Sequence, residues 1–521
     1  MSASREKHLR QELAAAGTTD NKAEMEQELA KKEKRSNALY ITIAVLFLLA
    51  LVASVVWRSN IIGKKATAAT IDGENYTAAE VNFYYWNGYN NFLTNYSYLV
   101  SYMGLDSSAS PKGQVMNETA VSMLGAAEGS TWHDYFLDQA LQQMAVVQVA
   151  LDKAEAEGYT YSESVQTQYD LTIESLRTTA AANGTTINAY LQGAYGPLMT
   201  ENVFSQELMR VSKYTDYINS YYTGLEFSDA EIEDAYAADR NSYDRISYES
   251  VSVSGAVAST TDANGNTVEP TEAETEAALK QASETAEKIL AAYKAGGDLK
   301  TIAESTEGAN YSSNDESTYF STDLGLWLFD ESREAGDCSI MLSGSTYYVA
   351  VFHDRFRLED PTIDVRHILI ATKTGELAST DEGYEAEQAQ LKADAKAAAD
   401  ALLAEWKAGE ASEESFAALA TANTDDTGSQ ATGGLYENVY EGQMVAEFND
   451  WCFDASRKVG DTDVVETSYG AHVMYFAGEN VPYWQYEVDS AMRSNAYNEW
   501  LMALPEGSTI TPSNFGMSFV G

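Results

Sequence analysis

Two histidines, His367 and His472, are the residues most able to do chemistry in this sequence. The chain has 5 histidines in 521 residues, and these two lie inside apolar, strand-like runs, VRHILI and YGAHVMYF. A single strand histidine is usually structural, but two histidines on paired strands can face each other across a sheet. The pattern therefore favours a functional site on these strands.

A metal or redox site is not indicated. The two cysteines, Cys338 and Cys452, form neither a Cys-x-x-Cys motif nor a Cys/His cluster, which disfavours a zinc site and a thioredoxin-like site. The two cysteines lie at non-equivalent positions of two internal repeats, near 241–358 and 361–479, so we expect two free thiols. We expect no metal and no cofactor.

An internal repeat organises the second half of the chain. WLFDESREAGD at 327–337 and WCFDASRKVGD at 451–461 are identical at 7 of 11 positions, and the strand-like runs at 246–253 and 347–352 align with those at 363–370 and 471–476. The sequence of each copy predicts, in chain order, a strand, a long Ala-rich helix, two short helices and two strands. We expect two α+β domains, near 241–358 and 361–479, each with helices on one face of a small antiparallel sheet.

The second copy resembles the parvulin family of peptidyl-prolyl isomerases. The resemblance rests on VRHILI, SFAALATANTDDTGSQATGG, YEGQMVAEFNDWCF and VVETSYGAHVMYF, in that order and spacing. It implies a polar group of His367, Asp426, His472 and Thr467, and a proline-ring pocket walled by Met444, Phe448 and Leu435. The chain departs from the family's usual Gly-Gly-x-Leu-Gly, because it reads Gly433-Gly434-Leu435-Tyr436.

These residue types suit rotation about an X-Pro bond. Amide resonance sets a barrier of about 20 kcal/mol to this rotation, and no nucleophile is required to lower it. A dry pocket can hold the proline ring while polar groups adjust the environment of the turning carbonyl. The site would then match the twisted transition state better than either planar ground state.

The first copy lacks the polar set. Ser250 stands where the alignment puts His367, and Tyr348 stands where it puts His472. The segment SSNDESTYFSTDLGLW contains no Met-x-x-x-Phe motif. We interpret the copy at 241–358 as a degenerate, catalytically inactive domain that binds chains or spaces the other parts.

Residues 66–240 read as a helical lobe. Val81, Tyr85, Tyr89, Phe92, Tyr96, Leu99 and Met103 recur at helical spacing. The stripe indicates either a packed core or an aromatic cradle for unfolded chains. This lobe and a helix within 480–521, which we expect to pack back on it, resemble the PrsA-type and SurA-type foldases.

An uncharged stretch at 38–57 predicts a membrane anchor. At about 1.5 Å per residue, its 20 residues could span a hydrocarbon core of about 30 Å. Four basic residues at 31–35 precede it and three at 58–65 follow it, which predicts a cytoplasmic tail at 1–37 and residues 66–521 outside the cytoplasm. The alternative is a cleaved signal peptide.

The resulting hypothesis is a single-pass, membrane-anchored extracytoplasmic foldase. Its partners would be unfolded or partly folded exported polypeptides containing X-Pro bonds. The net charge of −46 argues against nucleic acid as a partner. The alternatives are a catalytically silent holdase chaperone and an acidic, wall-associated structural protein.

Overall fold

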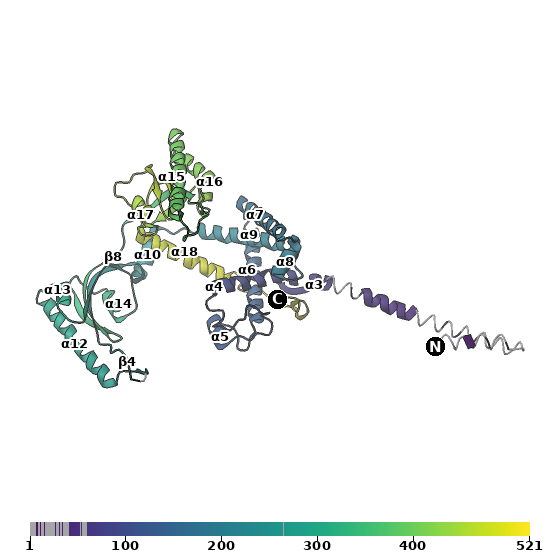
Figure 1. Ribbon diagram of the computed structural model, residues 1–521, viewed down its shortest axis with the longest axis horizontal. Helices are drawn as coiled ribbons and strands as arrows, with labels where there is room; N and C mark the ends of the chain where they lie inside the picture. The colour runs from purple at the N-terminus through teal and green to yellow at the C-terminus, as the bar shows by residue number, and fades with distance from the viewer. Residues whose placement is uncertain are drawn as a thin grey trace. The chain divides into compact units, whose positions relative to one another are not determined.

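The computed structural model describes residues 60–263 and 265–521, residues 41–52, and the single residues 7, 8, 11, 15, 27, 31, 34 and 54 (Figure 1). It divides into unit 1, Met1–Gly224 with Tyr497–Gly521, and unit 2, Leu225–Ala496. Residues 41–52 are helical, whereas most of the predicted tail 1–37 and both ends of the predicted span 38–57 lie outside the described residues. Within the described part of the chain, no helix has the length and apolar character needed to cross a membrane.

Unit 1 packs helices and one small sheet around an aromatic core. Its helices are α3 (Ile61–Lys65), α4 (Ala78–Asn95), α5 (Glu118–Leu124), α6 (Trp132–Ala156), α7 (Glu163–Ala182), α8 (Ile187–Tyr195), α9 (Glu201–Thr223) and α19 (Asn514–Met517). Its sheet has the order β13-β1-β2, formed by β1 (Thr67–Ile71), β2 (Glu74–Thr77) and β13 (Ile510–Pro512). The chain's C-terminal segment therefore belongs to this unit, where Trp500 also stacks on Tyr221 with ring centroids 3.9 Å apart.

The part of the predicted apolar stripe that lies on α4 packs in the core of unit 1, whereas α4 ends at Asn95 and Tyr96 beyond it is 38% exposed. Helix α4 begins at a capping box formed by Thr77 and Glu80. Four stripe residues on α4 are at most 6% exposed, and these are Val81, Tyr85, Tyr89 and Phe92. The core interpretation is confirmed for these residues, and the cradle alternative is wrong for them because their rings are covered.

The first sheet of unit 2 has the strand order β6-β3-β8-β7. It is preceded by α10 (Asp229–Ala238) and α11 (Arg240–Tyr243) and comprises β3 (Arg245–Ser254), β6 (Ala309–Ser317), β7 (Cys338–Ser343) and β8 (Thr346–Phe356). Side chains of α12 (Glu272–Lys294) and α13 (Leu299–Glu304) pack on one face, and α14 (Asp323–Leu328) packs on the other. A two-stranded ribbon, β4 (Thr260–Thr261) with β5 (Thr267–Val268), lies between β3 and α12 in the sequence.

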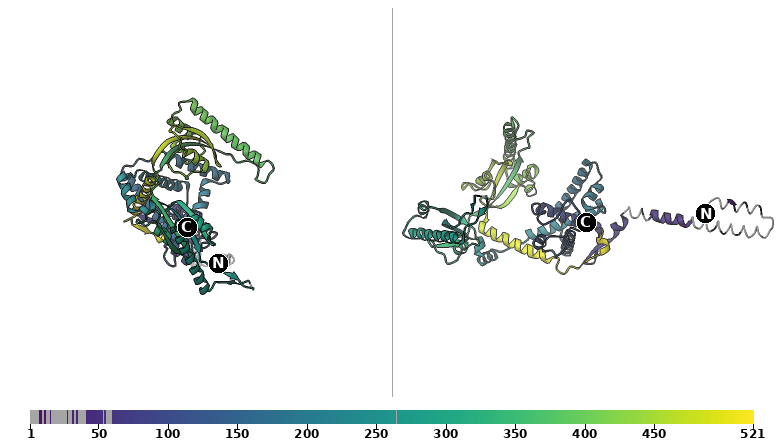
Figure 2. Two further views of the ribbon diagram at one scale, coloured as in Figure 1. Left: turned by 90° about the vertical axis from the view of Figure 1, so that its left-hand side faces the viewer. Right: turned by 60° about the horizontal axis from the view of Figure 1, so that its bottom comes forward.

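The second sheet repeats this plan with the order β10-β9-β12-β11. Its strands are β9 (Pro361–Ala371), β10 (Leu435–Val439), β11 (Thr462–Glu466) and β12 (Gly470–Pro482). Helices α15 (Tyr384–Ala408) and α16 (Glu413–Asn423) pack on one face, where α15 runs as the long green helix in Figure 2, and α17 (Ala446–Cys452) packs on the other. Helix α18 (Tyr483–Ala503) follows β12.

The predicted α+β class with small antiparallel sheets is confirmed. Our expectation of helices on only one face is wrong, because each sheet is apolar on both faces and needs cover on each. Cys338 and Cys452 are both free thiols, as predicted.

Candidate active site

The two predicted histidines meet on the α17 face of the second sheet. His367 on β9 pairs with Met474 in register, and His472 on β12 pairs with Leu369, so the histidines lie diagonally across neighbouring strands. Their Nδ1 atoms are 3.1 Å apart, and the residues are only 2% and 5% exposed. Strand pairing thus buries two imidazoles in direct contact.

Asp426 reaches this pair from a loop, residues 424–434, that connects α16 to β10. The loop is fastened to β9, because the Leu369 amide donates to the Thr424 hydroxyl and the Ala371 amide donates to the Asp425 carboxylate. Asp426 Oδ2 then lies 3.0 Å from Nε2 of His367. The loop therefore supplies the carboxylate that contacts His367.

The return of this loop to the sheet requires glycine at 434. Gly434 has a φ of +74°, and a Cβ there would lie 2.2 Å from the carbonyl oxygen of His367. The His367 amide donates to the Gly434 carbonyl at 2.8 Å, so the two backbones touch directly. A side chain at 434 would push the loop away from His367.

Thr467 completes the polar set at the opposite end. Its Oγ1 lies 2.9 Å from Nε2 of His472. One assignment of protons satisfies every contact: Thr467 donates to His472, His472 donates to His367 through Nδ1, and His367 donates to the carboxylate of Asp426 through Nε2. Both imidazoles are neutral in this arrangement.

The electrostatics favour this arrangement. Burial lowers the pKa of His367 against the opposing effect of Asp426, and burial with the neighbouring His367 lowers the pKa of His472 to about 4. Burial raises the pKa of Asp426, but hydrogen bonds from Ser429, Tyr436 and the Gly428 amide outweigh it and lower that pKa to about 2. At neutral pH the site therefore holds two neutral imidazoles and one carboxylate.

Met444 and Phe448 form the apolar side of the site. The Phe448 ring stands edge-on to both imidazoles, with centroids 5.6 Å from His367 and 5.5 Å from His472. Phe448 is buried, whereas Met444 is half-buried and packs against the same cluster. Polar and apolar walls thus meet at the histidine pair.

The structure does not place Leu435 in the apolar cluster that contains Met444 and Phe448. Leu435 is the first residue of β10, and Tyr436, not Leu435, packs with Met444 and stacks on His367. Successive strand residues point to opposite faces, so an error of one position changes the face. The pattern Gly-Gly-x-Leu-Gly, counted from Gly433, puts its leucine at 436 and could have identified Tyr436.

Ser429 is a second residue that the sequence did not reveal. Its hydroxyl donates to Asp426 and also lies 3.3 Å from Nε2 of His367. It is 1% exposed. The only sequence signal for it is its position three residues after Asp426 in a loop that must close on the sheet.

The first sheet keeps the same strand register without the polar set. Ser250 pairs with Ala350 and Ser252 pairs with Tyr348, as His367 pairs with Met474 and Leu369 with His472. Neither Ser250 nor Tyr348 can supply an imidazole. The structure thus places these two side chains where the alignment predicted them.

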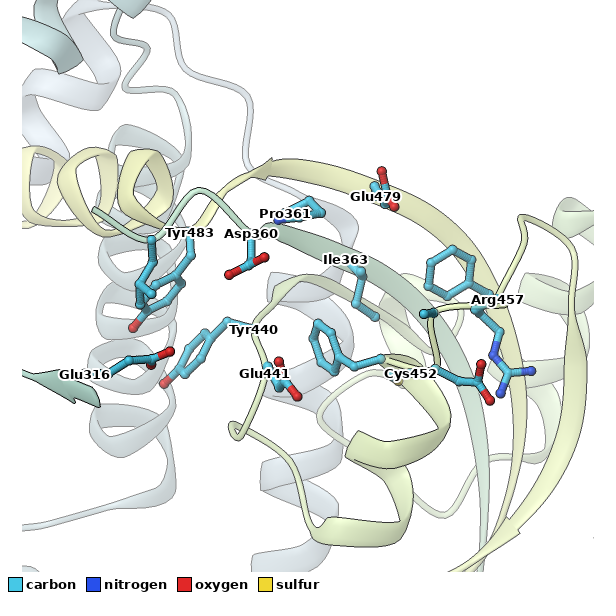
Figure 3. Close-up of a pocket in the computed structure, with 15 residues that line it drawn as sticks. Glu316, Asp360, Pro361, Ile363, Tyr440, Glu441, Cys452, Arg457, Glu479 and Tyr483 are labelled. Atoms are coloured by element: carbon cyan, nitrogen blue, oxygen red, sulfur yellow. The ribbon is translucent and has the colours of Figure 1, made fainter. Parts of the chain in front are cut away.

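A cavity of about 380 Å³ lies elsewhere in unit 2. Tyr440 and Tyr483 line it beside Ile363 and Glu441 (Figure 3). None of the residues predicted for the site is among its lining residues. Across the described residues, no group of three or more His, Cys, Asp or Glu side chains is arranged to hold a metal ion.

Comparison with known proteins identifies the domain that carries the histidines. Residues 351–478 match the family model of the PPIC-type PPIASE domain. None of the curated proteins matches the sequence.

Several solved structures are similar to parts of the chain. The peptidylprolyl isomerase PrsA of Bacillus anthracis is 20% identical over 29% of this chain and 58% of its own, with a TM-score of 0.18. PrsA of Bacillus subtilis is 14% identical over 73% of this chain and 89% of its own, with a TM-score of 0.29. A SurA-like chaperone of Campylobacter jejuni is 11% identical over 85% of this chain and 96% of its own, with a TM-score of 0.13.

The match at 351–478 includes both histidines, Asp426, Thr467 and the apolar wall. The parvulin resemblance is therefore confirmed for the second repeat. Residues 351–478 form a parvulin-type domain of the PPIC class.

Proposed function

We propose that the second repeat catalyses cis/trans isomerisation of X-Pro bonds, and that the whole chain is a foldase for exported polypeptides. The observation that carries this proposal is that a polar wall and an apolar wall meet at the His367–His472 pair. The hydrogen-bonded series from Thr467 to Asp426 forms the polar wall, and Met444 with Phe448 forms the apolar wall.

Each wall suits one part of an X-Pro segment. The proline ring would lie against Met444 and Phe448, which removes apolar surface from water. The carbonyl before the proline would turn beside the imidazoles, whose hydrogen bonds fix their orientation. A rigid polar wall costs no reorganisation during rotation, so it can stabilise the twisted amide more than the planar one.

The test is exchange spectroscopy on a short peptide with one Ala-Pro bond. The full chain, at a concentration far below that of the peptide, should increase the rate of cis/trans exchange above the spontaneous rate. An unchanged rate from the correctly folded chain would sink the isomerase proposal and favour a holdase.

A holdase activity has its own support in unit 1. The segment 96–124 exposes large apolar side chains, including Tyr98 at 78% and Tyr102 at 65%. Exposed aromatic rings can bind unfolded chains without demanding one sequence. We expect the full chain to slow aggregation of a proline-poor unfolded client, and Tyr98→Ser with Tyr102→Ser to weaken this effect while Asp426→Ala does not.

We also propose that the chain is anchored in the cell membrane by residues 38–57, with residues 66–521 outside the cytoplasm. The support is the uncharged stretch and the larger number of basic residues before it than after it. Protease added to intact protoplasts should degrade the parvulin segment. Protection of that segment would contradict the orientation.

A further inference from the structure

Tyr436 connects the apolar and polar walls of the site. It lies on β10, where its ring packs in the cluster that contains Phe448 and Met444. The ring also stacks on the His367 imidazole, with centroids 4.8 Å apart and an interplanar angle of 24°. Its hydroxyl donates to Oδ2 of Asp426 at 2.8 Å. One side chain thus contacts both members of the His367–Asp426 pair.

The hydroxyl of Tyr436 acts on the same carboxylate oxygen that receives the proton of His367. Oδ2 of Asp426 accepts from His367, Ser429 and Tyr436, whereas Oδ1 accepts from the Gly428 amide. These four donors fix the rotation of the carboxylate and favour its ionised form. Loss of one donor would loosen the acceptor that orients His367.

The other titratable groups near Asp426 do not replace this contact. The carboxylate of Asp425, the neighbouring residue in the loop, accepts a hydrogen bond from the Ala371 amide at 2.9 Å. His472 on β12 reaches Asp426 only through His367. Burial raises the pKa of Tyr436 to about 12, with the carboxylate contributing, so its hydroxyl stays a donor throughout the neutral range.

We propose that Tyr436 is a positioning residue for isomerisation: its hydroxyl fixes the Asp426 carboxylate, which in turn fixes the tautomer and orientation of His367. This inference rests on the proposed function and deepens it. The ring and the hydroxyl have separable roles. The ring forms part of the apolar wall, and the hydroxyl acts only through Asp426.

The test is a double-mutant cycle in the full chain, with exchange spectroscopy on the Ala-Pro peptide. Tyr436→Phe removes the hydroxyl and keeps the ring. We expect it to lower kcat about tenfold, the effect of losing one hydrogen bond to a charged group, with little change in KM because the apolar wall is kept. In an Asp426→Asn background, the same substitution should change kcat less than about twofold, because the hydroxyl has lost the carboxylate through which it acts.

Tyr440→Phe is the matched control. Tyr440 lies four residues further along, lines the cavity of Figure 3 and packs against Tyr483 with centroids 4.6 Å apart. The substitution removes a tyrosine hydroxyl from the same domain, outside the site. It should leave both kcat and KM unchanged.

Histidine-selective ¹⁵N labelling gives a readout that does not depend on turnover, and the chain has only 5 histidines. Wild type should show His367 protonated at Nε2 and His472 at Nδ1. In Tyr436→Phe, the His367 signal should move towards a mixture of tautomers, whereas Tyr440→Phe should match wild type.

These experiments distinguish failure of the proposed isomerase function from failure of the proposed role of Tyr436. If wild type does not accelerate exchange, the proposed function fails and with it the role of Tyr436 in the reaction. If wild type is active and Tyr436→Phe retains its kcat and its tautomers, the inference alone is overturned. Equal losses in the wild-type and Asp426→Asn backgrounds would also overturn it, because the hydroxyl would then act independently of Asp426.

Discussion

The two sheets of unit 2 share a strand register and differ at one edge. In the first sheet, β6 continues along β3 past Ser250, with Ser312 paired to Ser250 and Asn310 to Ser252. In the second sheet, β10 ends its pairing with β9 near Arg366, and the loop 424–434 leaves the edge beside His367. Because the pairing of β10 stops there, the loop can bring Asp426 to the edge of the second sheet. In the first sheet, β6 occupies the corresponding edge.

The apolar wall survives in both sheets. Phe320 and Leu324 pack on the α14 side of the first sheet, and Met444 and Phe448 pack on the α17 side of the second. Both pairs have the spacing of four residues, although only the second reads Met-x-x-x-Phe. The apolar wall therefore belongs to the fold, whereas the polar set is present only in the second sheet.

The largest effect should come from truncating the apolar-wall residue on α17 or α14, which is Phe448 in the second sheet and Leu324 in the first. Phe448→Ala should destabilise the second sheet by about 3–5 kcal/mol and abolish turnover, because Phe448 packs on both imidazoles. Leu324→Ala should destabilise the first sheet by about 2–5 kcal/mol and leave turnover unchanged. Hydrogen exchange of peptides from β3 and β9, with the isomerase rate, measures both. A fall in turnover in Leu324→Ala would contradict the assignment of the activity to the second sheet.

A smaller effect should come from low pH, which should destabilise the second sheet through His472 and have no such effect on the first sheet. The pKa of His472 is lowered to about 4 by burial and by His367, whereas an unfolded histidine titrates near 6.5. The unfolded state therefore gains the proton first, and the stabilising contribution of neutral His472 is lost as the pH falls from 6.5 to 4. The loss should reach about 3 kcal/mol, because each unit of pKa difference contributes about 1.4 kcal/mol.

Local hydrogen exchange of β12, corrected for the intrinsic rate, would measure this loss. His472→Gln should remove it. Strand β8 carries Tyr348 at the matching place and should show no such contribution between pH 6.5 and 4. The same pH response in wild type and His472→Gln would mean that other groups cause it.

The smallest effect should come from grafting the histidines into the first sheet. Ser250→His with Tyr348→His, made in an Asp426→Ala background, should add no turnover, because β6 occupies the edge where a loop would have to bring a carboxylate. The isomerase rate of the grafted chain against its Asp426→Ala parent measures this. A clear gain in rate would show that two histidines and an apolar wall are sufficient.

Much of the site could be predicted from sequence because its residues lie in ordered motifs. Two short strand-like runs identify His367 and His472, and the internal repeat predicts the matching strands of the first sheet. Tyr436 and Leu435 show the limit of such an assignment, because strand register decides which of two neighbours faces the site. Ser429 could not be predicted, since its role depends on how the loop 424–434 folds back on His367.

The helical part shows a different limit. Periodicity predicted the stripe on α4 correctly but could not tell a buried face from a binding face, because both are apolar. Only the packing of α6 and α9 around α4 decides that these rings are core. Of the exposed tyrosines in the segment 96–124, Tyr96 belongs to the periodic stripe, whereas Tyr98 and Tyr102 lie outside it.

Two single substitutions test most directly whether the second sheet holds a working isomerase site. Asp426→Ala removes the carboxylate and Met444→Ala removes a half-buried wall residue. Each should lower the rate of Ala-Pro exchange by roughly ten- to a hundredfold, equivalent to about 1–3 kcal/mol in the barrier, while circular dichroism stays near that of wild type. If both variants are folded and retain the wild-type rate, the site is misplaced and the holdase interpretation is the better one.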